Sequence, residues 1–279
     1  MSDAGRGRAG SGAGATGFTA LVLAGTRPGG DQLARAAGVS HKALAHVAGI
    51  SMLARVLDTL RATAAVRRVV VCGIDREALV TQPELRRFVE EVELVGSRTT
   101  PSASVLAALR ELDPCLPLLV ATADHPLLTP VLVDDFCARS VVSGADVTVG
   151  LVAAELVHRA FPTPRRTILP FRDGAYCGCN LYAFLTAAGQ RAAAAWTQIE
   201  QHRKRPWRIV SALGIGVTLR FLLRRLTVDA VTNLASERIG ARVRPIFLAH
   251  PEAGFDVDTW AHLAAAEAFL RARAGHSSN

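Results

Sequence analysis

Aromatic residues are scarce in this chain of 279 residues, and so are cysteines at spacings typical of disulfides or metal sites. Phe, Trp and Tyr together make up only 5%, so Ala, Val and Leu must fill any core. The five cysteines are odd in number and lack the spacing of a zinc site, so we expect neither a disulfide framework nor a cysteine metal site. This usage favours a reducing compartment, and we expect a cytoplasmic protein.

Long hydrophobic runs and several catalytic signatures are also missing. The most apolar stretch, residues 209–228, is interrupted by Arg220, Arg224 and Arg225, so we expect no membrane-spanning helix. No apolar segment precedes Gly17, so we expect no signal peptide. The chain has no G-x-S-x-G, no H-x-x-x-H spacing and no G-x-x-x-x-G-K-[ST] loop, so no hydrolase signature and no Walker-type loop is present.

The composition that is present fits a folded protein with an anionic partner. Half the residues are hydrophobic, which allows a sizeable core, and the net charge is +8. A basic balance suits nucleotides, sugar phosphates, nucleic acid or acidic lipid without choosing between them. We expect a disordered tail at 1–17, a single domain at 18–272 with a helical elaboration at 186–240, and a flexible tail at 273–279.

Short apolar runs alternate with helical patterns from Phe18 onward. Strands are predicted at 18–23, 69–72, 92–95, 118–121, 146–152, 178–184 and 243–248. Helices are predicted after Ser51 and after Thr129-Pro130, around Val105, within 191–240 and from Thr259. Strands that alternate with helices predict an α/β fold with a mostly parallel sheet. Ligands bind beyond the carboxyl ends of the strands in such sheets.

A glycine-rich loop follows the first predicted strand. It reads Leu23, Ala24, Gly25, Thr26, Arg27, Pro28, Gly29 and Gly30, and Lys42 lies beyond it. Glycine lets the backbone approach a ligand, and successive N–H groups can cradle an anion. Arg27 and Lys42 can neutralise phosphate oxygens. The loop predicts a triphosphate site; the alternative is an ordinary strand-to-helix turn with a surface arginine.

Carboxylates stand at two other places where ligands are expected. Asp124 follows a predicted strand, and Asp256 and Asp258 precede the last predicted helix. Mg²⁺ takes oxygen ligands, usually one or two carboxylates with substrate phosphates. These residues therefore predict a metal site. The alternative is that Asp256 and Asp258 only cap the helix.

These motifs, in this order, resemble the MobA-like NTP transferase family over roughly residues 18–272. The matching residues are Leu23, Ala24, Gly25, Arg27, Gly29, Lys42, Asp124, Gly178, Asn180, Tyr182, Asp256 and Asp258. The resemblance implies a Rossmann-like three-layer α/β/α domain with the GT-A-like nucleotidyltransferase fold. It implies transfer of NMP from an NTP to a small phosphorylated acceptor with release of pyrophosphate. It also implies Mg²⁺ on Asp124 and Asp258.

The resemblance gives the remaining residues their expected roles. Leu23, Ala24, Gly25, Thr26, Arg27 and Gly29 would bind the nucleotide, and Arg27, Lys42 and Asp124 would serve catalysis. Residues 31–40 are inserted before Lys42 relative to the family pattern, which would enlarge the loop over the triphosphate. Asn180 would bind a hydroxyl of the substrate.

The segment around Arg98, Ser102 and Ser104 resembles the part of cytidylyltransferases that packs near the base. Arg98 and Ser102 would then bind the nucleotide. The alternative, on equal terms, is that Ser102 or Ser104 only caps a helix.

Two questions stay open at this point. A GT-A glycosyltransferase would also use an Asp pair and a metal, although the L-A-x-G loop with Arg27 argues against it. A catalytically inactive nucleotide-binding module is the other rival. The basic stretch 202–208 is a solvated face, an acceptor site or a contact with acidic lipid. Its aromatics are few, so no nucleic acid is expected.

Overall fold

Strands and helices alternate along the chain as the periodicity predicts. The computed structural model describes residues 17–26, 30–113, 116–163, 167–201 and 226–276. The strands are β1 (Phe18–Leu23), β2 (His46–Val47), β3 (Ile50–Ser51), β4 (Val66–Cys72), β5 (Glu93–Val95), β6 (Leu118–Thr122), β7 (Val147–Ala153), β8 (Leu169–Phe171), β9 (Gly174–Phe184) and β10 (Val243–Leu248).

Helices connect these strands. They are α1 (Gln32–Ala36), α2 (Met52–Ala62), α3 (Arg76–Thr81), α4 (Pro101–Glu111), α5 (Pro130–Val142), α6 (Ala154–Ala160), α7 (Gly189–Gln201), α10 (Val228–Ile239) and α11 (Trp260–His276). The described residues also form three short 3-10 helices, η1 (Lys42–Leu44), η2 (Pro83–Phe88) and η3 (Pro251–Gly254).

One mixed sheet organises the described residues. Its order is β10-β7-β9-β6-β1-β4-β5, and β8 pairs with β9. β1 runs parallel to β4 and β6, β4 to β5, and β10 to β7. Only β9, between β6 and β7, and its partner β8 are antiparallel to their neighbours within this sheet. The expected α/β fold with a mostly parallel sheet is confirmed.

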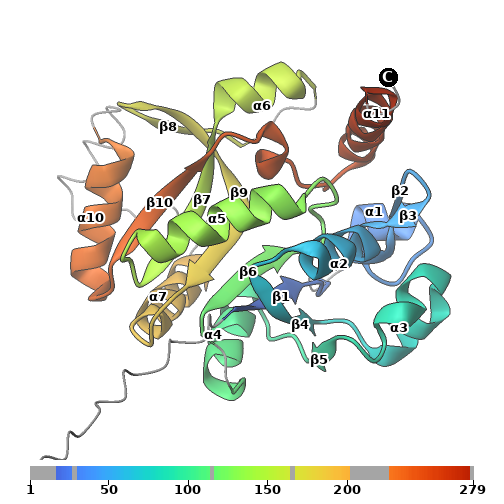
Figure 1. The fold of residues 1–279 in the computed structure, drawn as a ribbon, viewed down its shortest axis with the longest axis horizontal. Coiled ribbons are helices and arrows are strands. Elements are labelled where there is room, and N and C mark those ends of the chain that lie inside the picture. Colours follow the sequence, from blue (N-terminus) through green and yellow to red (C-terminus); the bar gives the residue numbers. More distant parts are fainter. Residues whose placement is uncertain (1–16, 27–29, 114–115, 164–166, 202–225, 277–279) are drawn as a thin grey trace, which may run out of the picture.

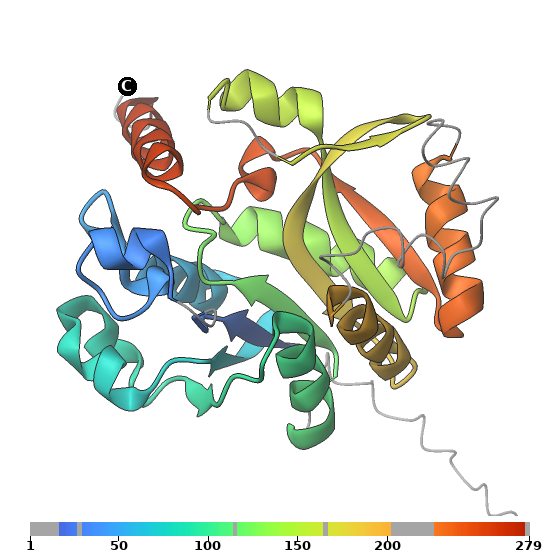
Figure 2. The same ribbon diagram turned by 180° about the vertical axis from the view of Figure 1, so that it is seen from behind.

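Helices cover both faces of the sheet, as the two opposite views show (Figures 1 and 2). Alternate residues of β1 explain why. Ala20 and Val22 belong to a core that includes Phe136 of α5, whereas Leu21 packs with Leu109 of α4 on the other face. Full burial of a side chain as large as Phe136 contributes about 1.5–3 kcal/mol. The three-layer α/β/α arrangement is therefore built from hydrophobic residues on both faces of each central strand.

Helix caps follow the expected chemistry, with one correction. The Ser51 hydroxyl accepts from the Ala54 N–H at 3.4 Å, and that of Thr129 accepts from the Leu132 N–H at 3.3 Å. The helix α4, however, is capped by Thr100, whose hydroxyl accepts from the Ala103 N–H at 3.2 Å. The alternative in which Ser102 or Ser104 caps this helix is therefore wrong, because both lie inside its first turns.

The ends of some elements differ from the predicted ranges. The segment 186–240 contains α7 and α10, and the residues 202–225 between them lie outside the described residues. The helix α11 continues to His276, so the predicted tail from residue 273 begins as helix. The predicted tail at 1–17 is almost wholly outside the described residues. Within the described part of the chain, no helix combines the length and hydrophobicity needed to cross a membrane.

Candidate active site

A pocket of ≈ 290 Å³ opens where three central strands end. Leu23 at the end of β1, Cys72 at the end of β4 and Thr122 at the end of β6 all line it. The chain moves outward from β1 to β4 and β5, then returns to β6 on the other side of β1. This reversal of strand order is where open α/β sheets bind ligands.

The loop after β1 is packed tightly against the loop after β4. The Ala24 N–H donates to the Cys72 carbonyl at 2.9 Å. Gly73 has φ +89°, and a Cβ there would lie 2.6 Å from the Gly25 Cα. Glycine is required at residue 73 on both counts, because the left-handed backbone disfavours other residues and there is no room for a side chain. The backbone of Gly25 is thereby held at the pocket.

Most of the predicted nucleotide-binding loop reaches the pocket. Leu23, Ala24, Gly25 and Thr26 line it. Arg27 and Gly29 lie outside the described residues, so their roles stay predictions.

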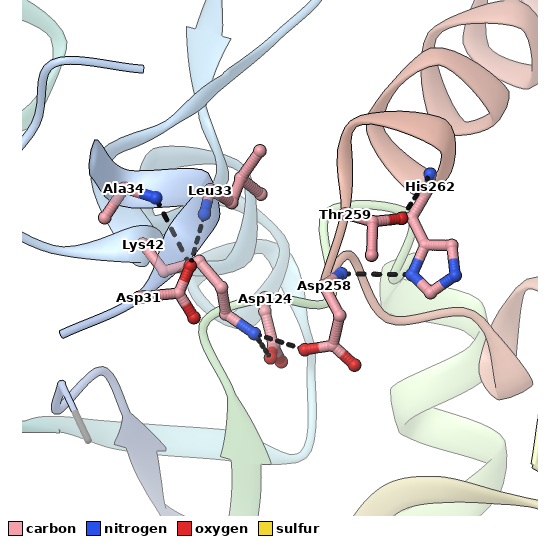
Figure 3. Close-up of polar contacts among 8 residues, drawn as sticks. All are labelled: Asp31, Leu33, Ala34, Lys42, Asp124, Asp258, Thr259 and His262. Atoms are coloured by element: carbon pink, nitrogen blue, oxygen red, sulfur yellow. Dashed lines mark hydrogen bonds and ion pairs between the residues drawn. The ribbon is translucent and has the colours of Figure 1, made fainter. Parts of the chain in front are cut away.

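The segment 31–40, which we expect to be an insertion, contains the short helix α1 beside the pocket. Asp31 caps it, because its Oδ1 accepts from the Leu33 N–H at 2.8 Å and the Ala34 N–H at 3.2 Å (Figure 3). Leu33 is buried in the main core. This segment is therefore folded onto the domain, and the chain continues from it into η1 with Lys42 facing the pocket.

Lys42 joins two carboxylates that are far apart in the sequence. Its Nζ lies 2.5 Å from Asp124 Oδ2 and 2.6 Å from Asp258 Oδ1 (Figure 3). Burial lowers the pKa of Lys42, but the charges and hydrogen bonds of Asp124 and Asp258 raise it more, so the pKa lies above its usual value. Lys42 is therefore an ammonium at neutral pH.

Buried and pocket-lining side chains alternate along residues 255–258, and this alternation explains how Asp258 reaches Lys42. Phe255 and Val257 are fully buried, and the Phe255 ring stacks on Phe161 with centroids 4.1 Å apart. The Val257 N–H donates to the Asp124 carbonyl at 2.8 Å, so the two aspartate segments are joined by their backbones. The side chains between the buried positions face the pocket, which Asp256 and Asp258 both line.

Three carboxylates at this end of the pocket fit a hard divalent cation. Asp124, Asp256 and Asp258 each offer an oxygen, and these oxygens lie within 4.8 Å of one another. The buried Oδ1 of Asp124 has no hydrogen-bond partner in the described part of the chain. A buried carboxylate oxygen without a donor is costly unless a cation or another donor reaches it. We call Lys42, Asp124, Asp256 and Asp258 the charged end of the pocket.

The predicted segment around Arg98 forms another side of the pocket, and it places Arg98 and Ser102 differently. Arg98 and Ser104 line the pocket, yet the Arg98 guanidinium binds both oxygens of Glu111, at 2.6 and 2.9 Å. Ser102 is fully buried behind the lining and donates its N–H to Glu200 Oε2 at 3.1 Å. Ser102 therefore lies behind the pocket lining and supports it. Its side chain is not exposed to the pocket for direct contact with a nucleotide.

Asn180 lies in the pocket lining on an irregular part of β9. Its φ of +50° is unusual for a residue other than glycine. The pairing of β9 with β7 shifts register between Val149 and Leu151, opposite this position. The distorted strand presents the Asn180 side of β9 to the pocket, where a carboxamide can donate and accept hydrogen bonds.

Trp196 and Glu200, both on α7, are among the lining residues that sequence reasoning missed. The Trp196 ring packs against that of Tyr182, with centroids 4.9 Å apart. Burial raises the pKa of the Tyr182 hydroxyl to about 12, with smaller contributions from Cys179 and Glu200. A single Trp and a single Glu on an amphipathic helix carry no motif, and no spacing signalled them. We call Tyr182, Trp196 and Glu200 the α7 wall.

Comparisons with known proteins found a family model and a curated relative that match this chain. A family model described as the MobA-like NTP transferase domain matches residues 20–271. The bifunctional protein GlmU of Azorhizobium caulinodans is 38% identical over 109 residues, which make up 39% of this chain and 24% of that protein. The match thus spans about a quarter of the relative's length.

Two solved structures share the fold over most of the chain. A hypothetical transferase from Thermus thermophilus has a TM-score of 0.75 and 28% identity, over 89% of this chain and 100% of that one. The 4-diphosphocytidyl-2C-methyl-D-erythritol synthase of Anaerococcus prevotii has a TM-score of 0.54 and 14% identity, over 92% and 97%. The second likeness concerns the fold alone.

Proposed function

The chain belongs to the MobA-like NTP transferase family and is a nucleotidyltransferase, and from this premise we propose that it moves NMP from an NTP to a small phosphorylated acceptor with release of pyrophosphate. The observation that carries the proposal is the meeting of Lys42, Asp124 and Asp258 beside the Gly25 loop. A triphosphate needs backbone donors, a cation and a metal site together, and this part of the pocket offers all three.

The triphosphate would lie along the Gly25 loop toward Lys42. Exposed backbone at Gly25 and Thr26 can donate to phosphate oxygens. Lys42 is an ammonium held between two carboxylates, so phosphate oxygens would compete with Asp124 and Asp258 for its protons. Arg27, on the same loop, remains the second expected phosphate-binding cation.

Asp124 and Asp258 would hold Mg²⁺, with Asp256 within reach as a further ligand. The chemistry of the site fits this ion, since all three groups are carboxylates. In addition, the buried Oδ1 of Asp124 accepts no hydrogen bond from the described residues. When bound, the ion offsets negative charge on the phosphates and on the leaving pyrophosphate.

The residues of this chain contribute positioning and charge. The acceptor phosphate is ionised at neutral pH, so its attack on the α-phosphorus needs no strong general base. As the new P–O bond forms, the bond to pyrophosphate breaks, and Lys42 with Arg27 would stabilise the charge on the leaving oxygens. Asn180 would orient a hydroxyl of the substrate at the β9 side of the pocket.

A screen of the four common NTPs against phosphorylated sugars and other small phosphates tests the proposal. We expect Mg²⁺-dependent pyrophosphate release with at least one pair. Release of nucleoside diphosphate from a nucleotide sugar instead would favour the glycosyltransferase alternative. NTP binding by calorimetry without turnover of any acceptor would favour the inactive nucleotide-binding module.

A further inference from the structure

The α7 wall differs in chemistry from the charged end of the same pocket. Tyr182 and Trp196 contribute neighbouring aromatic rings, and Glu200 contributes a half-buried carboxylate. An NTP has two unlike ends, a polyanion and a nearly uncharged base. The polyanion suits Lys42 and the glycine loop, and a flat, polar, uncharged ring suits an aromatic and carboxylate surface.

Glu200 is held in position by Ser102, and among the described residues only one of its two carboxylate oxygens accepts a hydrogen bond. Ser102 donates both its N–H, at 3.1 Å, and its hydroxyl to Oε2 of Glu200. No group in the described ranges of the chain donates to Oε1. Arg98, the described cation nearest in sequence to Ser102, has its guanidinium bound to Glu111. The remaining oxygen of Glu200 therefore favours a ligand that brings an N–H donor, and its charge disfavours phosphate.

The wall also lies next to the loop on which the triphosphate is placed. Gly25 is in contact with the segment that leads into α4, because a Cβ on Gly25 would lie 3.3 Å from the Ser97 Cβ. From Ser97 this segment runs through Thr99, Thr100 and Pro101, which line the pocket, to Ser102 beneath Glu200. A nucleotide with its phosphates on the Gly25 loop would therefore have this segment beside it for its base.

We propose that Glu200 determines base specificity by accepting a hydrogen bond from the exocyclic amino group of the NTP base. The inference rests on the proposed function, since it assigns the base end of the same nucleotide. If the base has a carbonyl oxygen in place of the amino group, two hydrogen-bond acceptors face each other, and binding is weaker. If the base has no group there, Oε1 receives no hydrogen bond from it. The site therefore favours CTP over UTP, ATP over ITP, or GTP over ITP.

Calorimetry of NTP binding without acceptor tests this assignment in three matched pairs, CTP with UTP, ATP with ITP and GTP with ITP. In the wild-type protein we expect the amino-bearing nucleotide to bind about tenfold more tightly in at least one pair, the scale of one base-specific contact. In Glu200→Gln, whose amide can also donate, we expect that preference to fall below about threefold. The exposed Glu155→Gln on α6 is the matched control and should keep the wild-type preference.

Each of the following results would overturn the inference. One is equal affinity for both members of each pair in the wild-type protein, which needs no variant. Another is a Glu200→Gln protein with unchanged base preference but lowered thermal stability, because Glu200 then only ties α7 to α4. A third is a change in acceptor KM alone. Failure of the wild-type protein to bind any NTP would overturn the proposed function as well, whereas pyrophosphate release without base preference would overturn only this inference.

Discussion

The two sides of the pocket are built on different principles. At the charged end, opposite charges from distant parts of the chain meet at contact distance, as Lys42 does with Asp124 and Asp258. On the α7 wall, Tyr182 and Trp196 pack as rings and Glu200 has no cation partner within the described residues. We expect changes at the charged end to affect every nucleotide equally, and changes on the α7 wall to redistribute affinity among nucleotides.

The largest effect should come from the carboxylates of the charged end. We expect Asp124→Ala and Asp258→Ala each to reduce Mg²⁺-dependent turnover by more than about 100-fold. Loss of groups that only support metal ligands already costs 10–100-fold. Steady-state kinetics across Mg²⁺ concentrations measures this, with circular dichroism to verify the fold. Asp229→Ala, on the exposed start of α10, is the matched control. Near-normal turnover in both variants would refute the metal assignment.

Lys42→Met should separate the metal from the triphosphate. Without the ammonium, Asp124 and Asp258 lose their cation, so we expect Mn²⁺ alone to bind more tightly than in the wild-type protein. NTP affinity should fall by about 1.5–3 kcal/mol, the scale of a hydrogen bond to a charged group. Electron paramagnetic resonance of free Mn²⁺ and calorimetry with NTP would measure the two effects. Equal Mn²⁺ affinity in both proteins would mean that Lys42 does not neutralise this site.

The pH dependence of the Lys42 ion pairs has a definite sign. The two aspartates raise the pKa of Lys42 above 10.5, so any stabilisation from these pairs is fully present below the unfolded-state pKa. It is lost as pH rises through the raised pKa of the folded state. We expect the difference in Tm between wild type and Lys42→Met to be constant from about pH 6 to pH 9 and to shrink above about pH 10.5. A difference that shrinks already below pH 9 would contradict the raised pKa.

Arg27→Ala tests whether the charged end extends to the glycine loop. Arg27 lies outside the described residues, so its role comes from the sequence alone. We expect NTP affinity to fall by about 1.5–3 kcal/mol, to the same extent for all four bases. Unchanged affinity by calorimetry would return Arg27 to the role of a surface residue.

Gly73→Ala should disturb the loop without touching any charge. Its Cβ would lie 2.6 Å from the Gly25 Cα, and its φ of +89° is unfavourable for alanine. We expect a loss of stability of at least about 1–2 kcal/mol from the backbone conformation, together with weaker NTP binding because the loop must shift. Gly96→Ala, where a Cβ would meet open space, is the control. Chemical denaturation gives the stabilities, and similar values for both variants would contradict the close approach.

The smallest and least specific effect concerns residues 203–208, which lie outside the described residues. Our prediction is that reversing charge at Arg203 and Lys204 raises the acceptor KM and leaves NTP affinity nearly unchanged. Docking on acidic lipid would instead show as loss of cosedimentation with anionic vesicles and normal turnover of a dissolved acceptor. A solvated face would change neither assay by more than a few tenths of a kcal/mol.

Local signals explain which parts of this protein could be predicted. The strand before the glycine loop, and the helices after Ser51 and Thr129, have periodicity and caps that act within a few residues. The helix caps also show the limit, because Thr100, Ser102 and Ser104 all have suitable hydroxyls and only the structure shows that Thr100 begins α4. The helices α3 and α6 had no clear pattern and were not predicted.

The candidate site also has residues that local signals indicate and contacts that only the fold creates. Asp124 and Asp258 were identified by position after a strand and before a helix, but their joint contact with Lys42 depends on the order of strands in the sheet. Glu200 became visible only through its hydrogen bonds to Ser102, which is 98 residues away in the sequence. The packing of α4 against α7 brings Ser102 and Glu200 together, and no local sequence pattern indicates this contact.

The most direct test of the central claim follows the phosphorus atoms of the NTP. The protein is incubated with Mg²⁺, an acceptor identified in the screen, and NTP labelled at either the α- or the γ-phosphorus. The account predicts that the α-label appears in the acceptor product and the γ-label in pyrophosphate, both lost in Asp124→Ala. Transfer of the γ-label to the acceptor, with nucleoside diphosphate as the other product, would contradict it.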